Sequence, residues 1–352
     1  RNFFFPALGL ALYNIPLILI LFLLAPKAPF QSLVLGFNLG HFFFLLILFL
    51  AAFYLGFRPF LSFNFFHPAI RRLLILILPV VVGSGLSYID MLIARSIGSY
   101  LGEGVISSLN YAYRLLGIPT GLMAGSIGIA VFPFLSSQAV ALDRRALARE
   151  TMRALRATWL ISLPIAVIFI LLPQPIIRIM FERGAFTPEA TQVTSTILSF
   201  FSYGVLAMTA WGILTRTFYS LQDTFTPLKV SFLQIALDIS LLLTLPRFLG
   251  YRGIPIATSL SMTLGCLLLW ELLSQKLPEV KEGGISEALS KVLAMCLVQA
   301  VFLSLTRRFL WEGRTWGLLS ELLLLAIAGG ASFLLFLGMG YLIRYPEMGM
   351  IK

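Results

Sequence analysis

One arginine and two carboxylates lie singly inside stretches of sequence that are otherwise apolar. Arg114 is in SLNYAYRLLGIPTG, Asp90 is in GLSYIDMLIARS and Asp238 is in SFLQIALDISLL. Ionisable groups inside membrane segments are costly, and they face a water-filled cavity or a partner rather than lipid. These residues are therefore the first candidates for a binding site.

The two carboxylates indicate cation or proton chemistry. Gln234 and Asp238 are four residues apart, so a helix would place them on the same face. Together with Asp90 they could form an oxygen cage for a hard monovalent cation, or a pair that titrates protons. Two simpler interpretations remain open: Asp90 pairs with Arg95 or Arg114, and Gln234 and Asp238 make only interhelical hydrogen bonds.

Arg114 indicates anion chemistry. An arginine near the middle of a membrane helix costs roughly 2.5–3.5 kcal/mol even on mild insertion scales. We therefore expect Arg114 to face a water-filled cavity or an anionic partner. The alternative is that its long side chain reaches the outer interface.

Apolar segments that could carry these residues fill almost the whole chain. A segment of roughly 20 apolar residues crosses a bilayer as a helix, and only 12% of all residues are charged. Uninterrupted apolar runs argue against a barrel of alternating strands. The sequence predicts an all-α polytopic membrane protein with about ten spans, at 4–25, 32–56, 73–97, 105–136, 155–177, 190–215, 227–246, 252–275, 289–306 and 316–343.

Basic residues predict the orientation of these spans. Lys and Arg are more frequent in the loops that lie in the cytoplasm if both termini do. The net charge of +11 is thus mainly a topology signal, and its scatter over short loops argues against nucleic-acid binding. The two cysteines, Cys266 and Cys296, fall in predicted spans and show no metal-ligand spacing.

An aromatic and basic stretch at 57–72 and a polar stretch at 277–288 divide the chain into predicted parts. Residues 1–58 would form a first part with two helices, and 59–72 a cytoplasmic interfacial linker. Residues 73–276 would form a six-helix lobe, followed by two additional helices and a cytoplasmic tail in 277–352. Within the lobe, 143–157 reads as an amphipathic cytoplasmic helix that either anchors on anionic lipid or binds a partner. We find no motif of an enzyme active site.

Several collinear motifs resemble the lipid II flippase family (MurJ, or MviN) of the multidrug/oligosaccharidyl-lipid/polysaccharide exporter superfamily. They extend over the whole chain: RNFFFPALGLALYNI at the start, SYIDMLIA, GEGVISSLNYAYRL, GIPTGLMAGSIGIAVFPFLSS, PIIRIMFERGAFT, RTFYSLQDTFTPLKVS and GYRGIPIATSLS. Members have fourteen helices in two six-helix lobes, plus two helices that line a lipid-accessible groove. This chain resembles the fifth to the fourteenth, so 1–58 would be the remnant of the N-terminal lobe, and the two helices in 277–352 would be the groove-lining pair. It starts at Arg1, so we expect a fragment that lacks four helices and is inactive alone.

The resemblance implies roles for individual residues. Arg114 matches the family's cavity arginine and would bind substrate, although Tyr113 stands where Asp often precedes that arginine. A sodium site would comprise Asp90, Gln234, Asp238, the backbone carbonyl of Ile254, and Thr258. At the position of Gln234 the family commonly has Asn, which is one methylene shorter than Gln.

The implied function is translocation of lipid II, the undecaprenyl-pyrophosphate-linked peptidoglycan precursor, across the bacterial plasma (inner) membrane by alternating access. The resemblance also implies that the protein is not an enzyme and that Na+ could be its coupling ion. Its partners would be lipid II and membrane lipids, and the peptidoglycan-synthesis machinery could be a further partner. Two alternatives stay open. One is an exporter of another polyprenyl-linked oligosaccharide or of an amphipathic drug. The other is a polytopic glycosyltransferase or scaffold.

Overall fold

The computed structural model describes residues 9, 12–54, 56, 85, 88–122, 143–312 and 316–347. Within these ranges every regular element is a helix. The chain divides into two compact units, residues 1–74 and 75–352. This division lies next to the predicted linker at 59–72, which is outside the described residues.

The first unit contains a helical hairpin of α2 (Asn14–Leu24) and α3 (Pro29–Tyr54). Two glycines on successive turns of α3 let the helices approach closely. A Cβ on Gly36 would lie 3.0 Å from the Cα of Leu17, and one on Gly40 would lie 2.5 Å from the carbonyl oxygen of Tyr13. Small residues at such spacing let helix backbones pack in a membrane, where apolar side chains gain little from burial.

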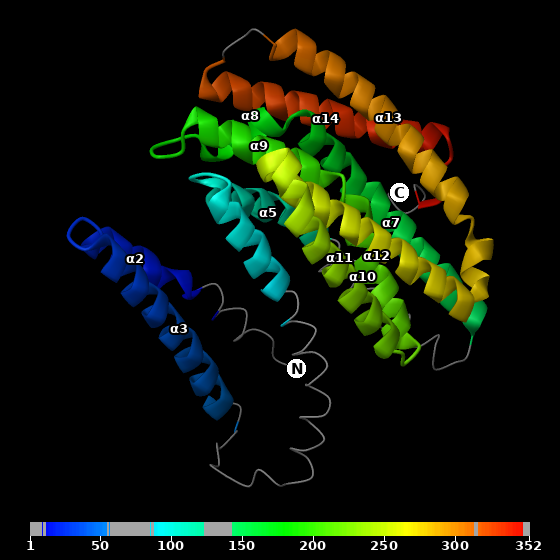
Figure 1. The fold of residues 1–352 in the computed structure, drawn as a ribbon, viewed down its shortest axis with the longest axis horizontal. Helices are drawn as coiled ribbons and strands as arrows, with labels where there is room; N and C mark the ends of the chain where they lie inside the picture. The colour runs from blue at the N-terminus through cyan, green and yellow to red at the C-terminus, as the bar shows by residue number, and fades with distance from the viewer. Residues whose placement is uncertain are drawn as a thin grey trace. The chain divides into compact units, whose positions relative to one another are not determined.

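The second unit is built from long helices that run side by side (Figure 1). Residues 88–100 are helical and precede the first of them. The remaining elements are α5 (Val105–Leu122), α7 (Arg144–Leu171), α8 (Pro173–Phe181), α9 (Pro188–Ser202), α10 (Val205–Ser220), α11 (Phe225–Leu249), η2 (Gly250–Arg252), α12 (Gly253–Lys276), η3 (Pro278–Gly283), α13 (Ile285–Leu310) and α14 (Leu318–Leu342).

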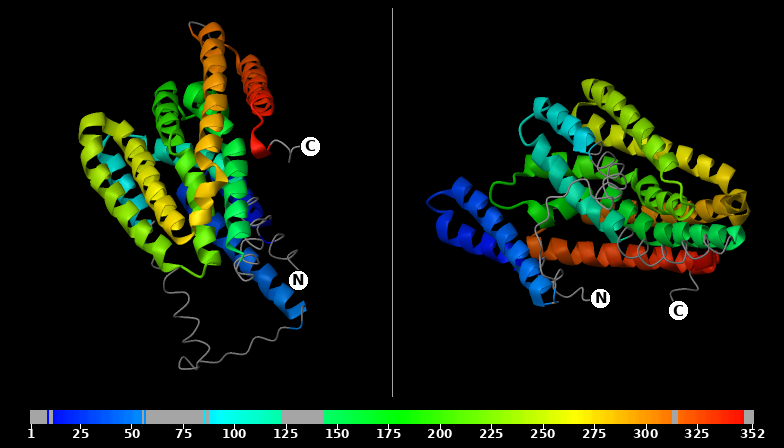
Figure 2. Two further views of the ribbon diagram at one scale, coloured as in Figure 1. Left: turned by 90° about the vertical axis from the view of Figure 1, so that its right-hand side faces the viewer. Right: turned by 90° about the horizontal axis from the view of Figure 1, so that it is seen from below.

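Helix α7 is the centre of this unit and contacts α5, α8, α9, α10, α13 and α14. Its interior Pro164 has no N–H for the helical ladder. The fully buried Gln299 of α13 donates from Nε2 to the carbonyl oxygen of Pro164 at 3.1 Å. The same nitrogen lies 3.4 Å from Ser332 Oγ on α14. One amide therefore joins α7, α13 and α14, and the views of Figure 2 show α13 and α14 together along one edge of the unit.

Two features differ from the predicted boundaries. We expected an amphipathic helix at 143–157 and a span at 155–177. Both begin in one continuous helix, α7, which ends at Leu171, before the predicted end of the span. The predicted span 190–215 is broken into α9 and α10, which meet at 48°. The break lies at Gly204, where a Cβ would be 2.9 Å from Ser259 Oγ on α12, so close packing against α12 requires a glycine there.

Five helical stretches of the described chain are long and apolar enough to cross a membrane, or up to six if the α9–α10 pair is one span. One of them, Phe225–Lys276, comprises α11 and α12, which pack on each other as a hairpin. Large apolar side chains are widely exposed on these helices. This exposure suits a lipid solvent, and the chain is a multi-pass membrane protein. The predicted spans 73–97 and 105–136 lie partly outside the described residues.

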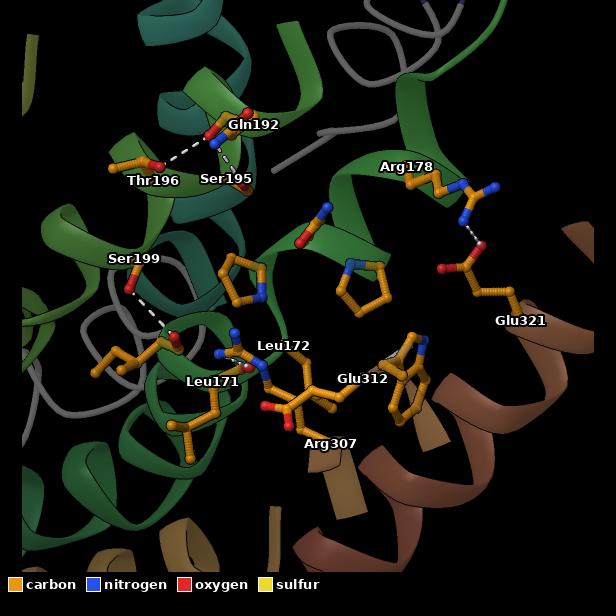
Figure 3. A pocket seen from close by; sticks show the side chains of 15 residues that line it. Leu171, Leu172, Arg178, Gln192, Ser195, Thr196, Ser199, Arg307, Glu312 and Glu321 are labelled. Carbon is orange, nitrogen blue, oxygen red and sulfur yellow. Dashed lines mark hydrogen bonds and ion pairs between the residues drawn. The ribbon is translucent and has the colours of Figure 1, made fainter. Parts of the chain in front are cut away.

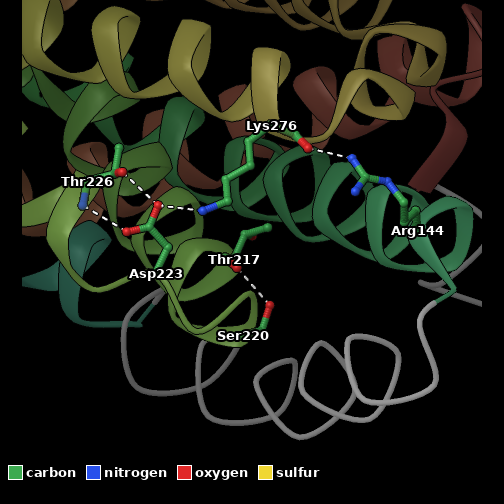
Figure 4. A network of polar contacts seen from close by, with 6 residues as sticks. All are labelled: Arg144, Thr217, Ser220, Asp223, Thr226 and Lys276. Atoms are coloured by element: carbon green, nitrogen blue, oxygen red, sulfur yellow. Dashed lines mark hydrogen bonds and ion pairs between the residues drawn. The ribbon is translucent and has the colours of Figure 1, made fainter.

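A polar network closes the end of the unit where α7 begins (Figure 4). Arg144 Nε lies 3.1 Å from Glu279 Oε1 and also donates from Nη2 to the carbonyl oxygen of Lys276. Lys276 Nζ lies 2.8 Å from Asp223 Oδ2, and Asp223 accepts two further hydrogen bonds from Thr226. The network joins α7, α12, η3 and the turn between α10 and α11.

Candidate functional site

Three of the predicted substrate and cation residues, Asp90, Arg114 and Thr258, line one cavity of about 700 Å³ in the second unit. It is bounded by residues from the 88–100 helical segment, α5 and α12. Asp90 and Arg114 both line it, together with Met91, Ala94, Arg95, Leu109, Asn110, Tyr113 and Thr258. The structure thus brings together residues that are up to 168 positions apart in the chain.

The two membrane carboxylates face each other at the wall of this cavity. Asp238 is fully buried on α11, and its side chain neighbours those of Asp90, Thr258 and Ser261. Within the described part of the chain, neither oxygen of Asp238 has a well-formed hydrogen bond, nor has Oδ1 of Asp90. Among the described residues, neither carboxylate forms an ion pair with Lys or Arg. Two adjacent carboxylates without a counter-charge require a proton or a cation between them.

Neither Arg95 nor Arg114 forms the salt bridge with Asp90 that one of the alternatives predicted. Arg95 Nη2 donates to Asn110 Oδ1 at 3.0 Å, and not to Asp90. Arg114 is exposed on α5 and forms no hydrogen bond or ion pair with any described residue. Its guanidinium is therefore available to a ligand in the cavity.

Gln234 lies one helical turn before Asp238 and is turned toward α12. Its Nε2 lies 3.2 Å from Ser261 Oγ. This position exists because Gly265 has no side chain, since a Cβ there would lie 2.8 Å from Gln234 Cγ. The amide oxygen of Gln234 is left without a hydrogen-bond donor within the described chain, so it can still serve as an oxygen ligand.

Ile254 and Thr258 are one helical turn apart near the start of α12. The Ile254 side chain is fully buried, and its carbonyl belongs to the helical ladder whose donor is the Thr258 N–H. Only the second lone pair of that carbonyl could bind a cation. Thr258 lies beside Asp238 and lines the cavity, so it fits the proposed ligand set more directly.

Two polar neighbours of the site, Asn110 and Ser261, were not predicted from the sequence, and Tyr113 was noted there only as the residue before Arg114. Asn110 lies one turn before Arg114 on α5, and Ser261 one turn after Thr258 on α12. The i, i+4 and i, i+3 spacings to recognised site residues were the available signals. The ring of Tyr113 packs on that of Phe201, with centroids 4.4 Å apart, and its hydroxyl is beside Thr258.

The donor set is suited to a hard cation. Carboxylate and hydroxyl oxygens lie together here, and the Gln234 amide is one helical turn from Asp238. Oxygen atoms of these kinds are the ligands that hard metal ions prefer. Among the described residues, no three or more His, Cys, Asp or Glu side chains are grouped to hold a metal ion. A site with two carboxylates and neutral oxygens would suit a single monovalent charge better than a transition metal.

Comparison with known proteins places these features in a family. The chain is 30% identical over 282 residues to a protein named "Probable lipid II flippase MurJ" from Rickettsia prowazekii. The aligned residues are 79% of this chain and 55% of that protein. A relative of the same name from Rhizobium tropici is 29% identical over 319 residues, or 87% of the chain and 58% of its own length. The chain thus spans little more than half the length of these relatives.

A solved structure named "Lipid II flippase MurJ, inward closed conformation" has the same fold. It superposes with a TM-score of 0.73 at 25% identity and covers all of this chain and 69% of its own. The family described as "Lipid II flippase MurJ" matches residues 1–327. With the membrane carboxylate pair and the free cavity arginine, these matches show that the chain belongs to the MurJ family of lipid II flippases.

Proposed function

We propose that the protein containing this chain translocates lipid II across the bacterial plasma membrane by alternating access. The observation that carries the proposal is Arg114, a cavity arginine with no partner among the described residues. A guanidinium binds phosphate oxygens through a planar fork of charged donors. The pyrophosphate of lipid II would bind there while its polyprenyl tail remains in lipid.

Na+ is the proposed coupling ion. Asp90 and Asp238 would hold it with Thr258, the amide oxygen of Gln234 and the Ile254 carbonyl. The ion would supply the missing counter-charge, and it could shift the conformational equilibrium only through unequal affinity for the two states. The cavity and the carboxylate pair share Asp90 and Thr258, so cation and substrate would influence each other over a short distance.

The proposed orientation places both ends of this chain in the cytoplasm. It puts the Arg144–Lys276–Asp223 network on the cytoplasmic face, and the ends of α7 and α13 on the outer face. Lipid II, membrane lipids and the peptidoglycan-synthesis machinery are the proposed partners.

Complementation of cells depleted of their own lipid II flippase tests the function. The full-length protein should restore growth, whereas Arg114→Ala and Asp238→Ala should not, at equal membrane levels. Arg149→Ala is the matched control, because Arg149 is exposed on α7 and does not line the cavity. Growth with both cavity variants would refute the proposed substrate path. Failure of the wild-type protein would instead indicate another lipid substrate.

A further inference from the structure

A second cavity, of about 610 Å³, lies at the opposite end of α7 from the Arg144 network (Figure 3). It is bounded by the end of α7, by α8 and α9, and by the adjoining ends of α13 and α14. The first part of its lining is apolar: Ile170, Leu171, Leu172, Pro173, Pro175 and Trp311. The other lining residues are polar or charged, so the cavity has an amphiphilic wall.

Two of the four charged lining residues neutralise each other. Arg178 Nη1 lies 3.5 Å from Glu321 Oε2, and Arg178 Nε lies 3.5 Å from Glu182 Oε1. Glu321 is buried, so this pair fixes α14 against α8. The charges of Arg178 and Glu321 therefore stabilise the contact between α8 and α14, and we do not count them among the ligand-binding groups.

The other two charged residues, Arg307 and Glu312, are exposed and form no ion pair with the described residues. The one side-chain hydrogen bond of Arg307 to a described residue is the long contact of 3.5 Å from Nη1 to the carbonyl oxygen of Leu171. Figure 3 shows Arg307 and Glu312 on the same side of the cavity, with the Arg178–Glu321 pair on another. A single small headgroup could thus contact both the guanidinium of Arg307 and the carboxylate of Glu312.

Neutral lining groups add both hydrogen-bond donors and acceptors. The amide groups of Gln174 and Gln192 make no hydrogen bond within the described chain, so their N–H groups are free. The hydroxyl protons of Ser195, Thr196 and Ser199 are donated to main-chain carbonyls, which leaves those oxygens as acceptors. These groups could bind a ligand that carries both an anionic hydrogen-bond acceptor and a cationic hydrogen-bond donor.

From this lining we infer that the cavity binds a phospholipid whose headgroup carries a phosphate and a primary ammonium, as phosphoethanolamine does. Arg307 and the free amide donors would contact the phosphate, and Glu312 would accept from the ammonium. Phosphate takes charge-assisted hydrogen bonds from arginine, and ammonium gives them to carboxylate. A purely anionic headgroup would leave Glu312 beside a like charge.

The surroundings of the cavity suit a lipid. Phe309, Leu318 and Leu319 at the adjoining ends of α13 and α14 are 68%, 61% and 72% exposed, as expected of side chains in contact with acyl chains. The apolar part of the lining would contact the glycerol backbone and the first methylene groups. A cavity of this volume is within the range of small-ligand sites, roughly 300–1,000 Å³.

Native mass spectrometry of the full-length protein released from nanodiscs tests the inference. The discs would contain equal amounts of phosphatidylethanolamine, phosphatidylcholine and phosphatidylglycerol. Phosphatidylcholine keeps both charges but has no ammonium N–H, and phosphatidylglycerol has no cation. We expect phosphatidylethanolamine to be retained about tenfold over either, the ratio that a charged hydrogen bond of roughly 1.5 kcal/mol gives.

Arg307→Gln and Glu312→Gln should each lower this retention roughly tenfold. Arg308→Gln should leave it unchanged, because Arg308 is on the same helical turn but does not line the cavity. Unfolding midpoints of all three variants would verify that they are folded. Equal retention of the three lipids would overturn the inference, as would an equal effect of Arg308→Gln. An effect of Arg307→Gln without one of Glu312→Gln would refute the role assigned to the ammonium.

Discussion

Arg156 Nε on α7 donates a hydrogen bond to Glu347 Oε1, beyond the end of α14, across 2.6 Å. The same guanidinium donates from Nη1 to the carbonyl oxygen of Gly283, and the hydroxyl of Tyr345 donates to the carbonyl oxygen of Arg156. The Glu347 side chain is only 3% exposed. One arginine therefore fixes both the segment before α13 and the segment after α14 to the central helix.

Removal of Arg156 should be strongly destabilising. Arg156→Ala leaves the Glu347 carboxylate buried without its partner, and breaking such a pair costs roughly 3 kcal/mol or more. The unfolding midpoint in detergent should fall clearly, while Arg149→Ala, on the exposed face of α7, should change it little. Arg156→Ala combined with Glu347→Gln should recover part of the loss. If the single variant were as stable as the wild type, this anchoring role would be wrong.

The ion pair between Lys276 and Asp223 should give stability that is lost in acid. Burial by itself raises the pKa of Asp223, but hydrogen bonds from Lys276 and Thr226 outweigh it and lower the pKa from 3.8 to about 2. The ionised form therefore adds stability that is complete above about pH 4 and disappears as the pH falls through 2. Unfolding midpoints measured between pH 2 and 6 should show this decline.

Asp223→Asn should remove that part of the decline and lower the midpoint at neutral pH. Glu189→Gln offers a comparison, because Glu189 is in the first turn of α9 and makes no ion pair with the described residues. An unchanged acid limb in Asp223→Asn would show that other carboxylates control it.

Sodium should stabilise the protein through Asp238. An ion present at about 100 times its dissociation constant adds about 2.7 kcal/mol if it binds only the folded state. The unfolding midpoint should therefore rise when choline is replaced by Na+ at constant ionic strength, and Asp238→Asn should abolish the rise. Asp223→Asn should retain it. A sodium response that persists in Asp238→Asn would place the ion elsewhere.

Gly265 should not tolerate alanine, although alanine is normally the better helix former by about 1 kcal/mol. The added Cβ would lie 2.8 Å from Gln234 Cγ and 3.2 Å from Trp211 Cζ3, so Gln234 would have to leave Ser261. We expect a lower unfolding midpoint and a weaker sodium response. Gly329→Ala is the control, because a Cβ there meets nothing within 4 Å. Equal midpoints for the two variants would show that Gln234 adjusts without loss.

Composition and hydropathy were sufficient to predict the kind of structure. Long apolar stretches with few charges require helices in lipid, and the described helices α11, α12, α13 and α14 lie within a few residues of their predicted bounds. The same rarity of charge singled out Asp90, Arg114 and Asp238, since any ionisable residue in such a segment needs a cavity or a partner. The family motifs added Ile254 and Thr258.

Contacts between distant segments depended on the tertiary structure. Hydropathy does not show the break at Gly204, because it arises from the approach of Ser259 on another helix. Nor does it show that Arg95 pairs with Asn110 while Asp90 faces Asp238, since these choices depend on how the helices are rotated about their axes. Local sequence thus determined which segments enter the membrane. Packing decided which polar side chains meet, because each of them can satisfy its charge or hydrogen bonds only where another helix brings a partner.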